Sequence, residues 1–60
     1  MDPNATLEQL RQLAVQVLNP DREDALVDEA AEEMAELVRA LDDWISRGGF
    51  LPAAWSRGRP

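Results

Sequence analysis

The sequence contains no cysteine, histidine, lysine or tyrosine among its 60 residues. Without cysteine no disulfide can stabilise a small fold, and without cysteine or histidine the possible metal sites reduce to oxygen ligands for hard cations. The usual general bases and covalent nucleophiles are missing as well. Carboxylates, Thr6, Ser46 and Ser56 remain, and a chain this short has little room for a substrate cleft. We therefore expect a protein that is not an enzyme and that holds no cofactor.

Long apolar runs are also absent from the sequence. No stretch approaches the roughly 20 apolar residues of a membrane span. The N-terminus lacks the basic segment and apolar segment that together mark a secretory signal. We expect a protein of the cytoplasm that does not interact with membranes.

Basic residues are scarce and unevenly placed. Six arginines stand against twelve acidic residues, which gives a net charge of −6. Residues 1–46 hold three arginines and all twelve acids, a net charge of −9, whereas residues 47–60 hold three arginines and no acid. Sequence-independent binding to nucleic acid needs a basic surface. We therefore do not expect direct nucleic-acid binding, and a small dimeric DNA-associated regulator acting through its arginine tail is an alternative only.

Helical periodicity is the main positive signal. Apolar residues recur at alternating steps of three and four, and a second apolar row widens the stripe. This pattern predicts a long amphipathic helix over residues 20–47, starting at Pro20 or Asp24 and stopped by Gly48-Gly49. The first row is Val27, Ala30, Met34, Leu37, Leu41 and Trp44, and the second is Ala31, Val38 and Ile45.

A shorter helix is predicted over residues 6–18. Thr6 and Gln9 fit a capping box, although Asp2 as N-cap with Pro3 at the first helical position is an alternative start. Asn19-Pro20 then breaks the helix, and so short a connection forces a sharp reversal. The prediction is one all-α domain over residues 1–55, an antiparallel helical hairpin, followed by a flexible basic tail at 56–60.

The two predicted helices differ in length. The short helix would cover only the N-terminal half of the long one, which leaves apolar side chains to be covered by a folded-back C-terminal segment, a second copy or another protein. Because a chain this small buries only about 60% of its unfolded surface, we expect a homodimer that forms a four-helix bundle. The predicted interface consists of Leu37, Leu41, Trp44, Ile45, Phe50, Leu51 and Trp55.

Two stretches resemble a group of short acidic proteins encoded by actinobacteriophages and some actinobacterial genomes. They are DPNATL, from Asp2 to Leu7, and LDDWISRGGFLPAAW, from Leu41 to Trp55, and together they cover about a third of the chain. Ile45 stands where leucine is expected. The resemblance implies a phage or actinobacterial origin and no particular activity. We predict a small non-catalytic accessory protein that acts in the host cytoplasm by binding itself and an unknown host or phage protein.

The predicted outer side of the long helix is acidic. Such a row of carboxylates could imitate a phosphate backbone and inhibit a host DNA-binding protein, which is the alternative function. A solvated helix face is the simpler interpretation, because acidic outer faces are common on amphipathic helices and Arg39 interrupts this one. The acidic residues are Asp28, Glu29, Glu32, Glu36 and Asp43.

Overall fold

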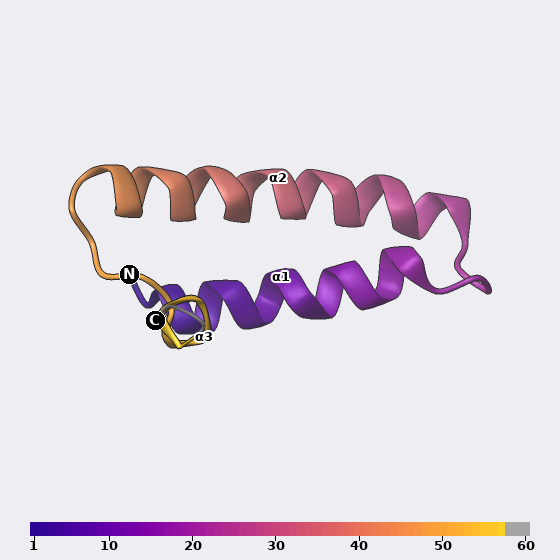
Figure 1. The fold of residues 1–60 in the computed structure, drawn as a ribbon. Coiled ribbons are helices and arrows are strands. Elements are labelled where there is room, and N and C mark those ends of the chain that lie inside the picture. The colour runs from indigo at the N-terminus through magenta and orange to yellow at the C-terminus, as the bar shows by residue number, and fades with distance from the viewer. Residues whose placement is uncertain (58–60) are drawn as a thin grey trace.

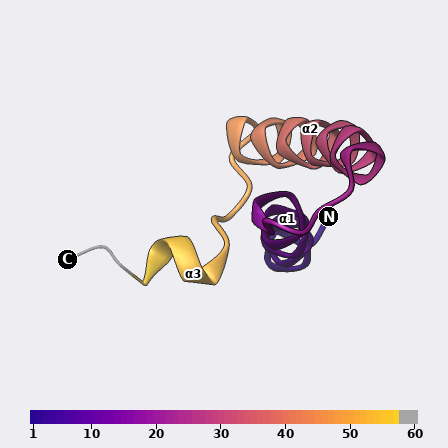
Figure 2. The ribbon, with the colours of Figure 1, turned by 90° about the vertical axis from the view of Figure 1, so that its right-hand side faces the viewer.

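The computed structural model describes residues 1–57, which form α1 (Pro3–Leu18), α2 (Asp24–Ser46) and α3 (Ala53–Ser56). The helices α1 and α2 run antiparallel and pack side by side, and the chain then returns to bring α3 beside the N-terminal end of α1 (Figure 1). Seen end-on, α3 projects to one side of the hairpin (Figure 2). The prediction of an all-α helical hairpin is confirmed.

The helix α1 begins at Pro3, so the predicted start at Thr6 is wrong and the alternative start is correct. The Asp2 carboxylate accepts hydrogen bonds from the Asn4 and Ala5 N–H groups at 3.0 and 3.3 Å. Proline at the first helical position costs no hydrogen bond there. The Thr6 hydroxyl donates back to the Asp2 carbonyl oxygen at 3.1 Å instead of capping the helix.

The helix α2 begins at Asp24, the later of the two predicted starts, so the connection spans residues 19–23. The Asn19 side-chain oxygen accepts a hydrogen bond from the Asp21 N–H at 3.0 Å. Asn19 therefore stabilises a turn and does not cap α2. Glu23 occupies the N-cap position of α2 without a side-chain hydrogen bond.

The C-terminal end of α2 is a Schellman motif. The Gly49 N–H donates to the Trp44 carbonyl oxygen at 2.9 Å and the Gly48 N–H to that of Ile45 at 3.0 Å. Gly48 has a φ of 91°, which glycine adopts without strain. The predicted stop at the glycine pair is confirmed, one residue before the predicted end at Arg47.

The core of the single chain is small. Among residues 1–57 the buried hydrophobic side chains are Leu7, Ala30 and Leu41, and Pro3 and Pro52 are fully buried. The molecule is elongated, measuring 37 × 23 × 14 Å. Within the described part of the chain, no helix is long and apolar enough to cross a bilayer. The predicted tail at 56–60 overlaps α3 at its first residue, and residues 58–60 lie outside the described residues.

Candidate interaction surface

An apolar groove lies between α1, α2 and α3. Its volume is about 300 Å³. Three of its apolar side chains come from α2 at steps of three and four, which places them on one flank of that helix. Asp42 is the charged group in the lining. The lining residues are Leu10, Val38, Leu41, Asp42, Ile45 and Trp55.

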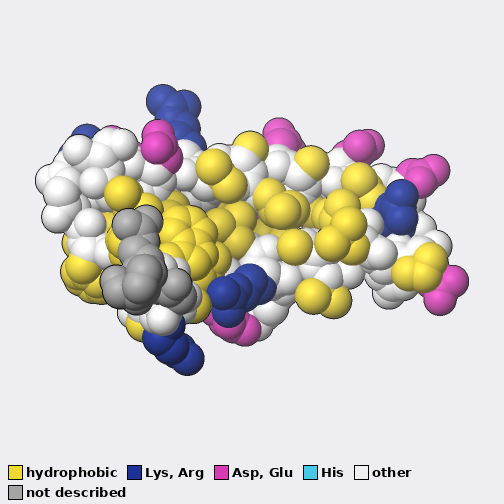
Figure 3. Space-filling view, in the orientation of Figure 1, with side chains coloured by type: hydrophobic (Ala, Val, Ile, Leu, Met, Phe, Trp, Pro, Cys, Tyr) yellow, Lys and Arg dark blue, Asp and Glu magenta, His cyan; other side chains and the backbone are white. Residues whose placement is uncertain are grey.

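The groove opens onto a wider apolar surface. Val38 is 53% exposed and Trp55 is 43% exposed, while Val15 and Leu18 on α1 are 71% and 78% exposed. At about 100° per residue, Val15 and Leu18 lie within about 40° of Asn4, whose side chain binds α3. They are therefore on the α3 side of the hairpin, where Figure 3 shows hydrophobic side chains along both helices. We call this surface, with the groove, the apolar face.

Asn4 holds α3 in place. Its side-chain oxygen accepts a hydrogen bond of 2.7 Å from the N–H of Ala53, the first residue of α3. The bond satisfies one of the free N–H groups of a helix whose own N-cap residue, Pro52, makes no side-chain hydrogen bond. Pro3 and Pro52, which precede the two bonded residues, are fully buried. Both a hydrogen bond and packing therefore fix the position of Trp55.

Asn4→Ala is expected to release α3 from α1 while the hairpin remains helical. The loss should resemble that of a helix cap, about 0.5–2 kcal/mol, and it should appear as faster hydrogen exchange at the Ala53 amide. Asn19→Ala is the matched control, because it removes a similar bond at the opposite end of the hairpin. Equal protection of the Ala53 amide in both variants would show that Asn4 does not hold α3.

Trp44 closes the turn after α2. Its Nε1–H donates to the Phe50 carbonyl oxygen at 3.0 Å, and the two rings meet edge to face with centroids 5.6 Å apart. A Cβ atom at Gly49 would collide with the indole ring. Leu37 and Leu51 are half-buried within the chain. Four of the seven predicted interface residues therefore lie outside the groove lining. Three of them are partly buried by their own chain, whereas Phe50 contacts Trp44 but is still 60% exposed.

The other three predicted interface residues, Leu41, Ile45 and Trp55, do meet in the groove. Leu41, however, is only 4% exposed. Leu41 is covered within its own chain, because Leu10 on α1 and Trp55 on the folded-back C-terminal segment, one of the three predicted covers, lie beside it. Leu41 belongs to the core and forms only the floor of the groove.

No protein-family model matches this sequence, and neither a curated protein nor a solved structure matches it. The apolar face must therefore be interpreted from its own chemistry.

Sequence reasoning missed part of the apolar face. Val38 belongs to the second apolar row of the long helix, which indicated its position, but it was not included in the predicted interface. Leu18 fits the inward stripe of the first helix by spacing, yet it is 78% exposed because it is the last residue of α1. Val15 lies off that stripe, and only its three-residue spacing from Leu18 signals a shared flank.

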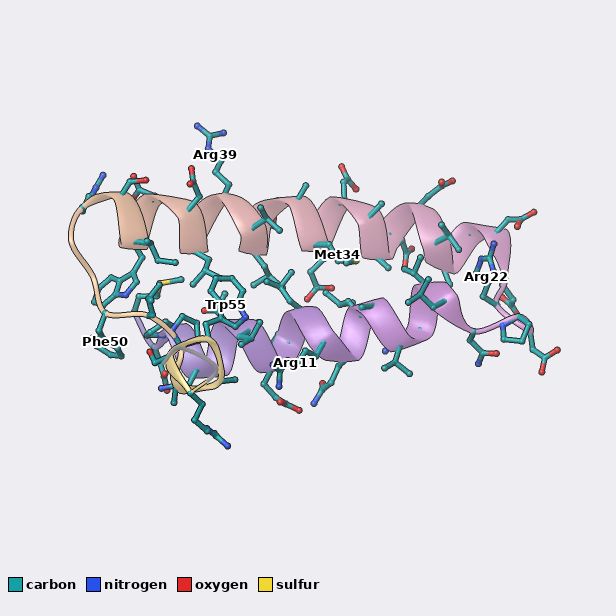
Figure 4. The ribbon with its side chains drawn as sticks, viewed as in Figure 1. Arg11, Arg22, Met34, Arg39, Phe50 and Trp55 are labelled. Atoms are coloured by element: carbon teal, nitrogen blue, oxygen red, sulfur yellow. The ribbon has the colours of Figure 1, made fainter. Side chains whose placement is uncertain are left out.

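The predicted acidic residues all lie exposed on α2. Asp43 is paired with Arg47, one helical turn later, at 3.2 Å, and Arg39 points away from α1 on the outer side of α2 (Figure 4). Among residues 1–57, no cluster of acidic side chains is arranged to hold a metal ion. The five acidic residues are Asp28, Glu29, Glu32, Glu36 and Asp43.

Proposed function

We propose that the chain is a small non-catalytic protein that acts by binding protein through its apolar face. The observation that supports this is the gathering of exposed large hydrophobic side chains from all three helices on one side. A small soluble chain that exposes such a patch typically uses it for binding. Trp55 sits at the edge of the groove, and tryptophan is among the residues that most often dominate binding energy.

The biological setting is part of the proposal. The DPNATL and LDDWISRGGFLPAAW stretches support an accessory role in a phage or an actinobacterium, with action in the host cytoplasm. These two stretches lie next to each other in the fold, since Asn4 of the first binds Ala53 of the second. The two stretches that carry the resemblance and the residues that line the groove therefore lie at the same end of the molecule.

The acidic outer side of α2 is the weaker candidate for the functional surface. Its acids are exposed, but Arg39 lies among them and Asp43 is neutralised by Arg47. A solvated helix face accounts for this arrangement without a partner. We therefore do not extend the proposal to imitation of nucleic acid.

Val38→Asp is expected to abolish protein capture by the immobilised full chain, because it places an unpaired charge at the rim of the groove. The bait would be presented with actinobacterial lysate and with untagged copies of the chain. We expect binding at least about 30-fold weaker for whatever the wild type retains, as for the loss of an interface hot spot of about 2 kcal/mol or more.

Leu26→Asp is the matched control. Leu26 is 40% exposed, also lies on α2, and is about 120° around the helix from Val38. Circular dichroism would establish that both variants are folded. Equal capture by the two folded variants would contradict binding through the apolar face.

A further inference from the structure

We infer that the occupant of the apolar face is a second copy of this chain. The inference rests on the proposed function and names the partner for the same surface. It commits to a two-fold pair in which each chain presents the same apolar face to the other, as most homodimers do.

The exposed surface of the single chain supports this choice. The chain exposes 4709 Å². A compact monomer of 6.7 kDa is expected to expose about 3,900 Å² by the scaling of surface with mass. The excess is comparable to the surface that each partner contributes to a standard interface, about 800 Å². Burial of about 800 Å² on each chain would therefore bring the exposed surface per chain down to the value expected for a compact monomer of the same mass.

The content of the core supports the same choice. Three hydrophobic side chains are buried among residues 1–57, and one of them is the alanine at position 30. The sequence contains no cysteine, so disulfides cannot make up for so small a core. Burial of Val15, Leu18, Val38 and Trp55 from each of two chains would add more large apolar side chains than the single chain buries.

Charge determines which surface can face a second copy. Each chain has a net charge of −6, and the outer side of α2 carries a row of acids that would repel the same row on another chain. On this side the charged residues are fewer and of both signs: Asp42 lines the groove on α2, and Glu8 and Arg11 lie within about 40° of Asn4 on α1 (Arg11 is labelled in Figure 4). Both signs are present on this side, so two copies that meet there concentrate less negative charge than two copies that meet through the acidic side of α2.

The shape of the face is also compatible with a two-fold pair. The helix α3 projects at the end of the hairpin that holds the N-terminus (Figure 2), whereas Leu18 ends α1 at the opposite end. A two-fold axis across the helices would place α3 of each chain beside the exposed Val15 and Leu18 of the other. The projecting α3 of one copy then covers the part of the other copy's apolar face that the other copy's own α3 does not reach.

Sedimentation of the full chain over a wide range of concentrations tests the inference. We expect the wild type and Leu26→Asp to sediment at twice the chain mass of 6.7 kDa. Val38→Asp should sediment as a folded monomer, with dimerisation at least about 30-fold weaker, as for the loss of an interface hot spot. Leu18→Asp, on α1 and at a site that is 78% exposed, should also weaken dimerisation. This variant replaces Val38→Asp in the test if Val38→Asp does not fold.

The alternative results overturn the inference in distinguishable ways. A wild type that remains monomeric at every concentration refutes self-association. If Val38→Asp nevertheless loses a captured protein that Leu26→Asp retains, the face belongs to another protein and the proposed function stands. A wild-type dimer that persists equally in Val38→Asp and Leu18→Asp shows that the copies meet elsewhere.

Discussion

Leu41→Ala is expected to remove most of the stability of the fold. Leu41 is 4% exposed and lies where α1, α2 and α3 meet. Truncating a buried leucine typically costs about 2–5 kcal/mol. The whole stability of a 60-residue chain is roughly 3–9 kcal/mol at the usual value per residue. Urea unfolding followed by circular dichroism should show a lower midpoint or no folded baseline.

Leu26→Ala is the control for this effect. Leu26 is on the same helix but is 40% exposed, so its truncation should cost much less. Equal shifts of the two midpoints would show that Leu41 is not a core residue. The same burial means that a charged residue at position 41 would unfold the hairpin. Val38 is therefore the better position for separating association from folding.

Gly49→Ala is expected to have the second largest effect. The added Cβ would collide with the indole ring of Trp44, which must then leave the turn. Its hydrogen bond to Phe50 and its edge-to-face contact with that ring would be lost together. Overpacking and a lost hydrogen bond sum to about 2–4 kcal/mol. Urea unfolding and the tryptophan fluorescence of the folded state would measure the change.

Gly48→Ala is the natural comparison, because it is the neighbouring residue with a different constraint. Its φ of 91° is unfavourable for alanine, but nothing lies within 4 Å of the added Cβ. We expect a loss of about 1 kcal/mol from backbone strain alone. If Gly48→Ala proved the more destabilising of the two, the close approach of Trp44 to Gly49 would not be important for stability.

Much of the hairpin could be predicted from the sequence because its signals are local. The spacing from Val27 to Trp44 indicated the long helix, and Gly48-Gly49 indicated its end. The helix starts were less certain, since two capping arrangements competed at each. At the start of α1, the Asp2 carboxylate accepts hydrogen bonds from two N–H groups, so the N-cap is Asp2 and not Thr6. At the second, the Asn19 side chain is used in a turn.

The candidate surface was harder to predict because it depends on contacts between distant residues. No local pattern indicates that the Asn4 side chain accepts a hydrogen bond from Ala53. Without that contact, Trp55 has no assigned position and Leu41 looks uncovered. The candidate surface includes Val15, Leu18 and Val38, which the predicted interface left out, because α3 lies on their side of the hairpin. A stripe of apolar residues indicates which side of a helix is buried, but not how far its cover extends.

The hydrogen bond between Asn4 and Ala53 joins residues 49 positions apart, whereas residues 19–23 alone connect α1 to α2. Closing a long loop costs more entropy than closing a short one, so the hairpin forms before the two ends of the chain meet. The docking of α3 is then a late step of folding and an early loss on unfolding. Interactions made after the transition state control the unfolding rate. The contact between the chain ends should therefore slow unfolding by an amount set by its own free energy.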